Sequence, residues 1–328
     1  MRLSFFITLL LALATAAVSA ELPSPYAKEP APGTEIVSPV DGAIMVWVPS
    51  GYFTMGMDRD RADKVLKDLG YKGGWEEAWA WEWAPEHKVY VPGFFIDKYE
   101  VTWGQWRKFV AANPKAQIKC KLPEEKVENE YALYPATTVY WADAAKYANW
   151  TGKALPYEAQ WEKAARGTDG RTFPWGNDLP TPDYGKFVDL KTHISNPTLC
   201  DMVGSHPKGA SPYGCEDMAG NVMEWTCEFL EPYQNNPYRD RMLSYTGHTN
   251  GCLRGGSFYF GSAAYICAKR FGFEPDIAYY HVGFRTVWAP PEDYFTTKAF
   301  EDAKAQVPAA KAEMEKLRTI GKPGGLAL

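Results

Sequence analysis

Residues 253–273 read LRGGSFYFGSAAYICAKRFGF. Two glycines and a serine lead into aromatic and small residues, one cysteine and a basic pair. Short apolar runs bounded by glycine are typical of strands that are joined by tight turns. Together with the neighbouring runs at 225–230 and 281–288, this stretch predicts a small antiparallel sheet in the C-terminal half of the chain.

The composition indicates a compact fold that is rich in turns. Aromatic residues make up 15% of the 328 residues, beside 25 Pro and 28 Gly. Large rings then fill space that long regular elements would otherwise occupy, and a disordered chain is excluded. The net charge is -5 and the Lys and Arg residues are scattered. Nothing forms the basic stripe that a phosphate backbone requires, so no nucleic-acid partner is expected.

The N-terminus has the pattern of a signal peptide over residues 1–20. An apolar run follows Arg2 and ends in Val18-Ser19-Ala20, the small-x-small pattern of a cleavage site. The run is shorter than the roughly 20 apolar residues of a membrane span. We therefore predict a secreted or periplasmic protein without a transmembrane anchor.

The rest of the chain divides into three parts. Residues 21–43 are Pro-rich and predict an extended leader. The main domain is predicted over 44–290, with order beginning near Ile44. Residues 291–328 predict a helical tail, broken at Pro308, that serves as a surface appendage or a partner-docking arm.

Local patterns predict the elements of the main domain. Alternation at 44–56 predicts a hairpin, and alternation at 87–102 predicts a strand. Helices are expected over 103–113 after the cap Thr102, over 139–151, and over 156–166. Residues 168–216 are predicted to be loops.

A dense tryptophan cluster covers Trp75, Trp79, Trp81 and Trp83. Such a cluster can line a ligand groove by stacking, although packing beneath a loop is the commoner position of buried tryptophan. The spacing does not decide between a helix and a strand here.

The chain has six cysteines, at 120, 200, 215, 227, 252 and 267. Their spacing matches no zinc motif, and in an oxidising compartment an even number predicts disulfides. Cys200 with Cys215, or Cys227 with Cys252, could close loops, but the connectivity stays open.

Several segments resemble, in order, the formylglycine-generating enzyme or sulfatase-modifying factor family. They are EHKVYVPGFFIDKYEVTWGQWRKFV, YPATTVYWADAAKYANWTGKALPYEAQWEKAARG, FPWGND, YGCEDMAGNVMEWT, LRGGSF and HVGFR. The resemblance runs from about Ile44 to Trp288. It implies an α+β fold related to C-type lectins, with little regular secondary structure, short antiparallel strands and a few helices.

The resemblance also identifies a departure at the reactive positions. Catalytic members of the family place one cysteine three residues past the serine of GGS and a second five residues further, and this pair binds copper and oxidises a substrate cysteine to formylglycine. In this sequence, Phe260 and Tyr265 stand there. Because Cu(I) needs thiolate ligands, copper binding and formylglycine formation by this route are not expected. A displaced pair, Cys252 with Cys267, is the alternative that would keep the activity.

The resemblance implies a substrate groove and two candidate catalytic residues, Ser257 and Glu274. Glu274 could act as a general base if burial raised its pKa. A serine nucleophile needs an adjacent base. His281 is the only histidine near Ser257 in the sequence, and closeness in sequence does not place it beside the serine, so Ser257 has no evident base. The residues expected to line the groove are Phe260, Tyr265, Arg270, Tyr279 and Tyr280. Arg285 is expected instead to pair with a carboxylate as an internal strut.

The segment at 213–226 matches a calcium loop of the family. The implied ligands are the side chain of Asp217, the carbonyls of Gly220 and Val222, and the carboxylate of Glu224. Calcium takes six to eight oxygens that include backbone carbonyls, and its role here would be structural. The alternative is a tight turn in which Asn221 and Glu224 bind backbone amides.

Two functions from different classes follow. Members of the family that lack the cysteine pair are implicated in oxidising a peptide-derived chromophore, which favours an extracytoplasmic maturation factor acting oxidatively on a peptide or protein partner. The alternative is a non-catalytic binding or assembly module that uses the lectin-like groove. A polar and aromatic groove favours the first, and a true formylglycine generator is the least expected.

Overall fold

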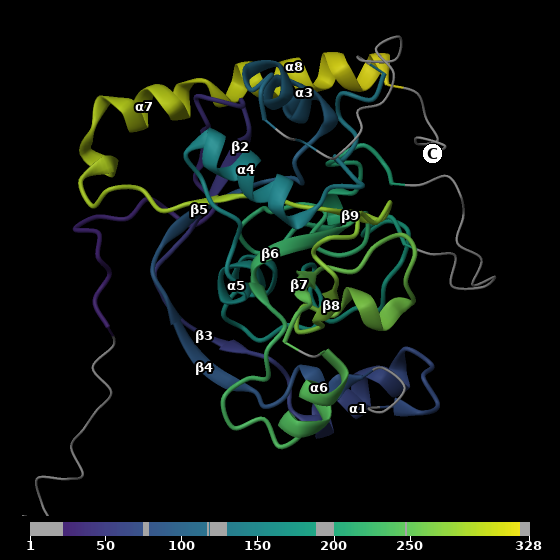
Figure 1. Ribbon diagram of the computed structural model, residues 1–328. Coiled ribbons are helices and arrows are strands. Elements are labelled where there is room, and N and C mark those ends of the chain that lie inside the picture. Colours follow the sequence, from purple (N-terminus) through teal and green to yellow (C-terminus); the bar gives the residue numbers. More distant parts are fainter. Residues whose placement is uncertain are drawn as a thin grey trace, which may run out of the picture.

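The computed structural model describes residues 22–74, 79–116, 118, 130–187, 200–246 and 248–321. Short strands and helices are joined by long irregular segments, and the fold is α+β as predicted (Figure 1). Within these residues the strands form sheets of order β1-β2-β5-β10, β3-β4 and β8-β7-β6-β9. None of the helices in these ranges is long and apolar enough to cross a membrane.

The first sheet brings the two ends of the domain together. β1 (Glu35–Val37), β2 (Ile44–Val48), β5 (Phe94–Asp97) and β10 (Val287–Trp288) pair antiparallel. β1 lies inside the segment that we predicted as an extended leader, so order begins before Ile44. Its pairing with β2 and the packing of buried Tyr26 on Trp47 account for this difference.

The second sheet replaces the hairpin predicted at 44–56. β3 (Gly51–Met55) follows β2 directly but pairs with β4 (His87–Val91), whereas β2 pairs with β1 and β5. Pro92 and Gly93 separate β4 from β5 in the same way. A Cβ on Gly93 would lie 2.4 Å from the ring of Trp47, so this turn depends on glycine.

The third sheet forms where the opening stretch predicts it. β6 (Met223–Phe229), β7 (Gly251–Arg254) and β8 (Phe271–Phe273) pair antiparallel. β9 (Val282–Gly283) pairs parallel to β6, which the prediction of a purely antiparallel sheet missed. The segment at 281–288 therefore serves two sheets, because β10 belongs to the first.

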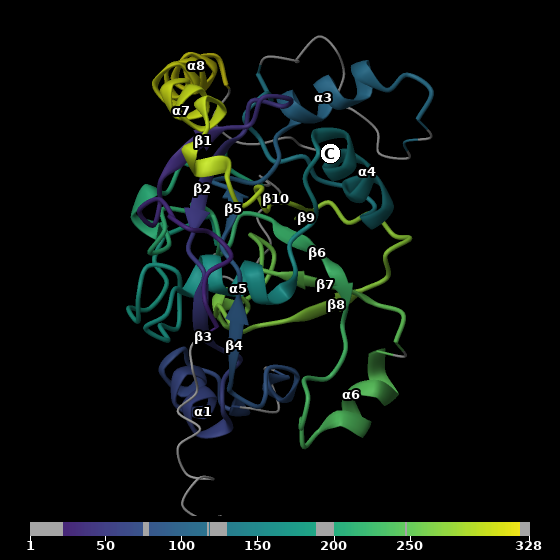
Figure 2. The same cartoon turned by 90° about the vertical axis from the view of Figure 1, so that its left-hand side faces the viewer.

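The three predicted helices are present as α3 (Trp103–Ala112), α4 (Trp141–Thr151) and α5 (Glu158–Arg166). Thr102 caps α3 in a capping box with Gln105, and Gly152 follows the end of α4 with φ +73°. α5 is buried at the centre of the molecule (Figure 2). α1 (Arg59–Asp68) and α6 (Arg239–Thr246) lie at the opposite end from the tail (Figure 1). Single 3-10 turns cover 80–82, 207–209, 262–265 and 294–296.

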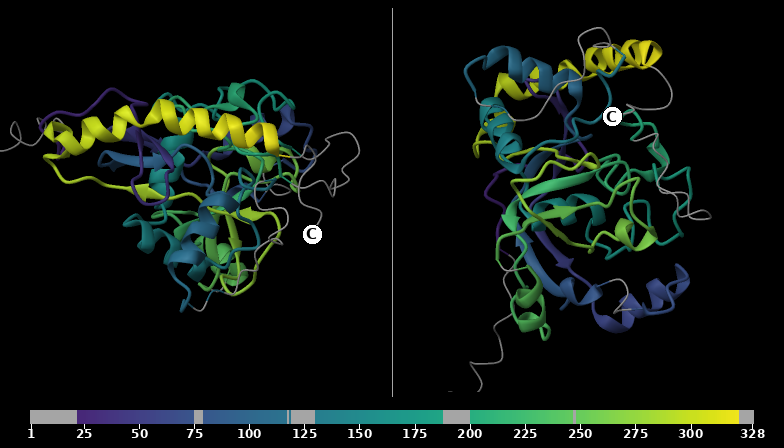
Figure 3. Two further views of the ribbon diagram at one scale, coloured as in Figure 1. Left: turned by 90° about the horizontal axis from the view of Figure 1, so that it is seen from above. Right: turned by 45° about the vertical axis from the view of Figure 1, so that its right-hand side comes forward.

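The tail is packed on the domain. α7 (Lys298–Ala305) and α8 (Val307–Ile320) form one rod along the side of the molecule (Figure 3). Pro308 lies in the first turn of α8 and is compatible with the helix there. Proline has no backbone N–H, but in the first turn this N–H would have no partner within the helix. Phe300 of α7 packs against Tyr294 and Phe295.

The tryptophan cluster packs mainly beneath a loop. Trp81 and Trp83 are buried, while Trp79 is 39% exposed and stacks on Trp81. Trp75 lies outside the described residues. Two of these rings therefore belong to the core and do not line a groove.

Candidate functional site

The turn after β7 sets the position of the candidate site. Gly255 and Gly256 have φ values of +91° and +67°, and a Cβ on Gly256 would lie 2.7 Å from the carbonyl oxygen of Ala264. Ser257 follows, fully buried, and its Oγ accepts a hydrogen bond from the amide of Tyr259 at 3.3 Å. The amide of Phe258 donates to the carbonyl of Asn221 at 3.0 Å. The GGS turn is thereby fixed to the loop at 213–226.

The two positions at which the resemblance places the reactive cysteines have different environments. Phe260 is half-buried among the rings of Phe271 and Phe273, at centroid distances of 5.3 and 6.3 Å. Tyr265 is completely buried, packs on Phe187 at 4.3 Å, and donates its hydroxyl to the carbonyl of Phe260. Tyr265 is a core residue, so our prediction that it lines a groove is wrong.

A cluster of aromatic rings surrounds His281. Tyr259 stacks on the imidazole with a centroid distance of 5.2 Å and an interplanar angle of 17°. The other rings within 6 Å belong to Phe260, Phe273, Tyr279 and Tyr280. We call these six residues the His281 cluster. Tyr259 and Tyr280 are 42% and 39% exposed and form its outer side.

The imidazole of His281 is buried without a hydrogen bond. Only 5% of the residue is exposed, and neither Nδ1 nor Nε2 has a partner within the described residues. Burial lowers the pKa of His281 to about 4, so the imidazole is neutral at pH 7. One nitrogen of a neutral imidazole donates and the other accepts, and leaving both unused in a buried place costs free energy. A bound group that uses these nitrogens would remove this cost.

The candidate catalytic residues do not act with His281 as a pair. No hydrogen bond joins Ser257 to His281 in the described part of the chain, so no base activates the serine there. Glu274 is exposed, and its pKa is lowered because the hydroxyl of Tyr279 donates to its Oε2 at 2.7 Å. The burial that a general-base role requires is absent, and the structure corrects this expectation for Glu274.

Arg270 has a structural role and does not line the His281 cluster. Its Nε and Nη2 donate to the carboxylate of Glu158 at 2.7 and 2.5 Å, and both residues are buried. The guanidinium also lies over the ring of Tyr233 at 4.1 Å. Glu158 precedes Arg270 by 112 residues, so proximity in sequence to Phe260 and Tyr265 was misleading.

Arg285 is the internal strut that the sequence predicts. Its Nε and Nη2 donate to Oε2 and Oε1 of Glu224 at 2.7 Å each, with both side chains fully buried. The indole of Trp161 donates to the same Oε2 at 2.8 Å. Arg285 also donates to the backbone carbonyls of Asp97, Lys98 and Glu216.

These contacts bear on the calcium loop. Glu224 does not fit the calcium shell as it is placed, since both of its oxygens accept hydrogen bonds from buried donors. Asp217 has φ +58°, accepts from the amide of Gly204 at 2.6 Å, and has its pKa raised to about 6 by burial. Asn221 stabilises the turn, because its Oδ1 accepts from the amide of Asp201 at 2.9 Å.

The five cysteines within the described residues are free thiols. Our prediction of disulfides among them is wrong, because the proposed partners pack in different parts of the core: Cys200 lies with Trp106 and Phe284, whereas Cys215 lies with Trp161. Cys120 lies outside the described residues. Burial raises the pKa of Cys267 to about 12 and raises that of Cys252 well above its usual value, so neither supplies a thiolate at pH 7.

Thiol titration tests this placement. In a Cys120→Ser variant we expect the four buried thiols to resist a disulfide reagent in the native protein, the partly exposed Cys227 to react sooner, and all five to react in guanidinium chloride. Fewer than five reactive thiols after unfolding without reductant would indicate that disulfides form.

Comparison with known proteins identifies the family. Residues 34–290 match the sulfatase-modifying factor enzyme 1-like domain, and the chain belongs to this family. The formylglycine-generating enzyme of Mus musculus is 28% identical in an alignment of 300 residues that covers 74% of this chain and 74% of that protein. The hercynine oxygenase of Mycobacterium tuberculosis is 31% identical in an alignment of 209 residues that covers 53% of this chain and 47% of that protein.

Solved structures confirm the fold class. PvdO from Pseudomonas aeruginosa has a TM-score of 0.58 at 22% identity, and the match covers 80% of this chain and 100% of that chain. CarF has a TM-score of 0.54 at 17% identity, with 77% and 100% covered. At these identities the likeness shows the fold alone.

Proposed function

We propose that this protein is an extracytoplasmic maturation factor that binds a peptide or protein partner at the His281 cluster and oxidises it without a thiolate pair. The observation that carries the proposal is the buried imidazole with two unpartnered nitrogens, beside Phe260 at a reactive position of the family. The signal-peptide pattern at residues 1–20 supports a secreted or periplasmic location. Relatives named as a formylglycine-generating enzyme and an oxygenase support oxidative chemistry.

The oxidation is balanced with dioxygen as the second substrate. The partner loses two electrons and two protons, and dioxygen takes up all four to form hydrogen peroxide. The neutral imidazole of His281 accepts a hydrogen bond from the group that loses a proton, and the rings around it exclude water. Tyr259 and Tyr280 provide rings on the outer side on which a planar group of the partner can stack.

A specific observation favours a second candidate function, a binding or assembly module without chemistry. The rings of Tyr259 and Tyr280, 42% and 39% exposed, contact each other at a centroid distance of 5.8 Å, and Ile277, three residues before Tyr280, is 46% exposed. Exposed apolar side chains that gather together are typical of interaction sites. In this case a partner would bind at the same cluster, but no dioxygen would be consumed.

Peptides of fixed sequence that vary at one position (Cys, Tyr, Trp or His) separate these functions. Binding is measured by calorimetry, and turnover by dioxygen uptake with peroxide detection, in protein with and without added copper. We expect uptake with a peptide that lacks cysteine, reduced at least about tenfold by His281→Phe. Binding without uptake would support the module instead. Copper-dependent turnover of the cysteine peptide would overturn both readings.

The same variant provides its own folding control. Phenylalanine keeps a flat ring of similar volume and removes two buried polar atoms that have no hydrogen bond. We therefore expect the melting temperature of His281→Phe to equal or exceed that of the wild type. A clear loss of stability would mean that His281 has a hidden structural partner, and any loss of activity would then be uninformative.

We also propose structural calcium at the loop at 213–226, held by the side chain of Asp217 and the carbonyls of Gly220 and Val222, while Glu224 stays paired with Arg285. Binding to the folded state alone raises stability with ligand concentration. Millimolar calcium is therefore expected to raise the melting temperature above the value in chelator, and Asp217→Asn is expected to remove this increase. Identical melting of the wild type in both buffers would contradict the proposal.

A further inference from the structure

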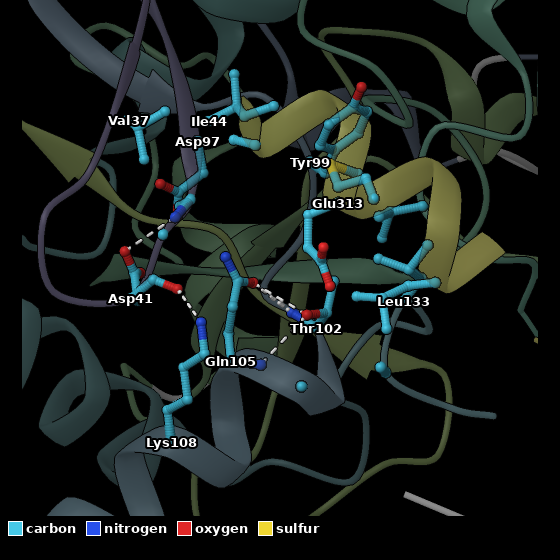
Figure 4. A pocket seen from close by; sticks show the side chains of 18 of the residues that line it. Val37, Asp41, Ile44, Asp97, Tyr99, Thr102, Gln105, Lys108, Leu133 and Glu313 are labelled. Atoms are coloured by element: carbon cyan, nitrogen blue, oxygen red, sulfur yellow. Dashed lines mark hydrogen bonds between the residues drawn. The ribbon is translucent and has the colours of Figure 1, made fainter. Parts of the chain in front are cut away.

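α8 is fixed near both ends and spans a cavity between them. Lys311 Nζ lies 2.5 Å from Oε2 of Glu35, and Arg318 Nη2 donates to the carbonyl of Val203 at 2.9 Å. Ala310, directly before the first contact, and Met314 and Leu317, between the two contacts, lie on one face of the helix and are half-buried. This apolar face borders a cavity of about 670 Å³ (Figure 4). The volume is in the range of small-molecule sites, which is roughly 300 to 1,000 Å³.

The polar groups at the base of the cavity differ in how well they are paired. Asp41 and Asp97 line it, and each accepts a hydrogen bond from the buried ammonium of Lys153, at 2.7 and 2.9 Å. Figure 4 shows Asp41 and Asp97 on one side of the cavity and Leu133 on the other. The exposed Lys108 donates to the carbonyl of Asp41 at 3.1 Å.

Glu100 lines the same cavity and is incompletely paired. It is 1% exposed, and its Oε1 accepts from Nδ2 of Asn221 at 3.1 Å. Its Oε2 is buried and has no hydrogen-bond partner among the residues that the structure describes. Burial, reinforced by the charge of Asp217, raises the pKa of Glu100 well above its usual value. Oε2 is the one oxygen of this carboxyl group that lacks a hydrogen-bond donor among the described residues.

We propose that this cavity binds an alkylammonium group, with the ammonium donating to Oε2 of Glu100 and the hydrocarbon chain lying along Ala310, Met314 and Leu317. Asp41 and Asp97 share the ammonium of Lys153, and Arg107 and Lys108 also line the cavity, whereas Oε2 of Glu100 has no donor among the described residues. A donating cationic head is therefore favoured there over an anionic one. A purely apolar molecule would leave Oε2 without a donor. The ammonium comes from a free aliphatic amine or from a lysine side chain of a peptide. This site is independent of the His281 cluster.

Calorimetry with n-hexylamine, n-hexanoate and 1-hexanol tests the proposal on the mature full-length chain. We expect n-hexylamine to bind at least tenfold more tightly than the other two. Glu100→Gln should weaken n-hexylamine binding at least tenfold, while its amide oxygen still accepts from Asn221. Ala310→Trp should abolish binding by filling the cavity. Ala312→Trp, on the exposed side of the same helix, is the matched control and should bind normally.

The peptide acetyl-Leu-Lys-Leu-amide distinguishes the two sources. Binding of this peptide that Ala310→Trp abolishes would assign a lysine side chain, and binding of n-hexylamine alone would assign a free amine. Equal binding of n-hexylamine and n-hexanoate would overturn the proposal. It would also be overturned if no probe bound, or if Glu100→Gln and Ala310→Trp both bound n-hexylamine like the wild type while melting normally.

Discussion

Glu224→Ala is expected to lower the free energy of unfolding by about 3 to 5 kcal/mol, because the guanidinium of Arg285 is then left buried without its carboxylate. Both side chains are fully buried, and two hydrogen bonds of 2.7 Å join them. The variant also removes the acceptor for the indole of Trp161. Chemical denaturation followed by tryptophan fluorescence measures the effect.

A surface pair provides the matched control for this prediction. Glu315 pairs with Arg318 at 3.5 Å, but the Glu315 side chain is 73% exposed. Glu315→Ala should change the free energy of unfolding by no more than about 1 kcal/mol. If Glu224→Ala cost equally little, Arg285 would not depend on Glu224, and this carboxylate would be available to a cation.

Elements with local causes could be predicted from the sequence. α3 begins after Thr102 and α4 ends before Gly152, because a capping side chain and a left-handed glycine act within one turn of the helix. The core positions of Trp161 and Ala165 on α5 follow from helical spacing in the same way. The family, and with it the fold class, followed from motifs in a fixed order.

The partners of the strands could not be predicted, since they depend on distant segments. β2 and β3 are separated by two residues, yet they belong to different sheets. β1 is ordered because β2 and the tail cover it, which no pattern within residues 21–43 indicates. In the sequence, Pro308 is compatible with the end of one helix or with the start of another. In the structure it lies at the start of α8.

The candidate site was predicted in part. Phe260, Tyr279 and Tyr280 do meet, and the aromatic residues on both sides of His281 in the sequence were a signal of its surroundings. The lack of partners for both nitrogens of His281 depends on how the cluster packs. No pattern in the sequence predicts it. Arg270 pairs with Glu158 by the same kind of long-range packing, which removes it from the groove.

The largest pH effect is expected where two carboxylates share one ammonium. Lys153 Nζ donates to Asp41 and Asp97, and Tyr147 and Thr286 donate to the same carboxylates at 2.8 and 2.5 Å. Burial alone would raise the pKa of Asp41, but the charge and hydrogen bond of Lys153 lower it. The pKa of Asp97 is raised, chiefly by burial. The lowered pKa of Asp41 gives stability that is present at neutral pH and is lost as the pH falls below about 4.

Lys153→Met reverses the sign of this dependence. Without the ammonium both carboxylates are buried with no counter-charge, so about 3 to 5 kcal/mol of stability is lost at pH 7. The folded variant then binds protons more tightly than the unfolded chain, whose aspartates titrate near pH 4. Its stability must therefore rise as the pH falls from 7 to 5, and denaturation at both values measures this. Lys208→Met, which removes the partner of the exposed carboxylate of Asp183, should show no such rise. An equal deficit of Lys153→Met at both values would contradict the pairing, because only protonation of the buried carboxylates can relieve it.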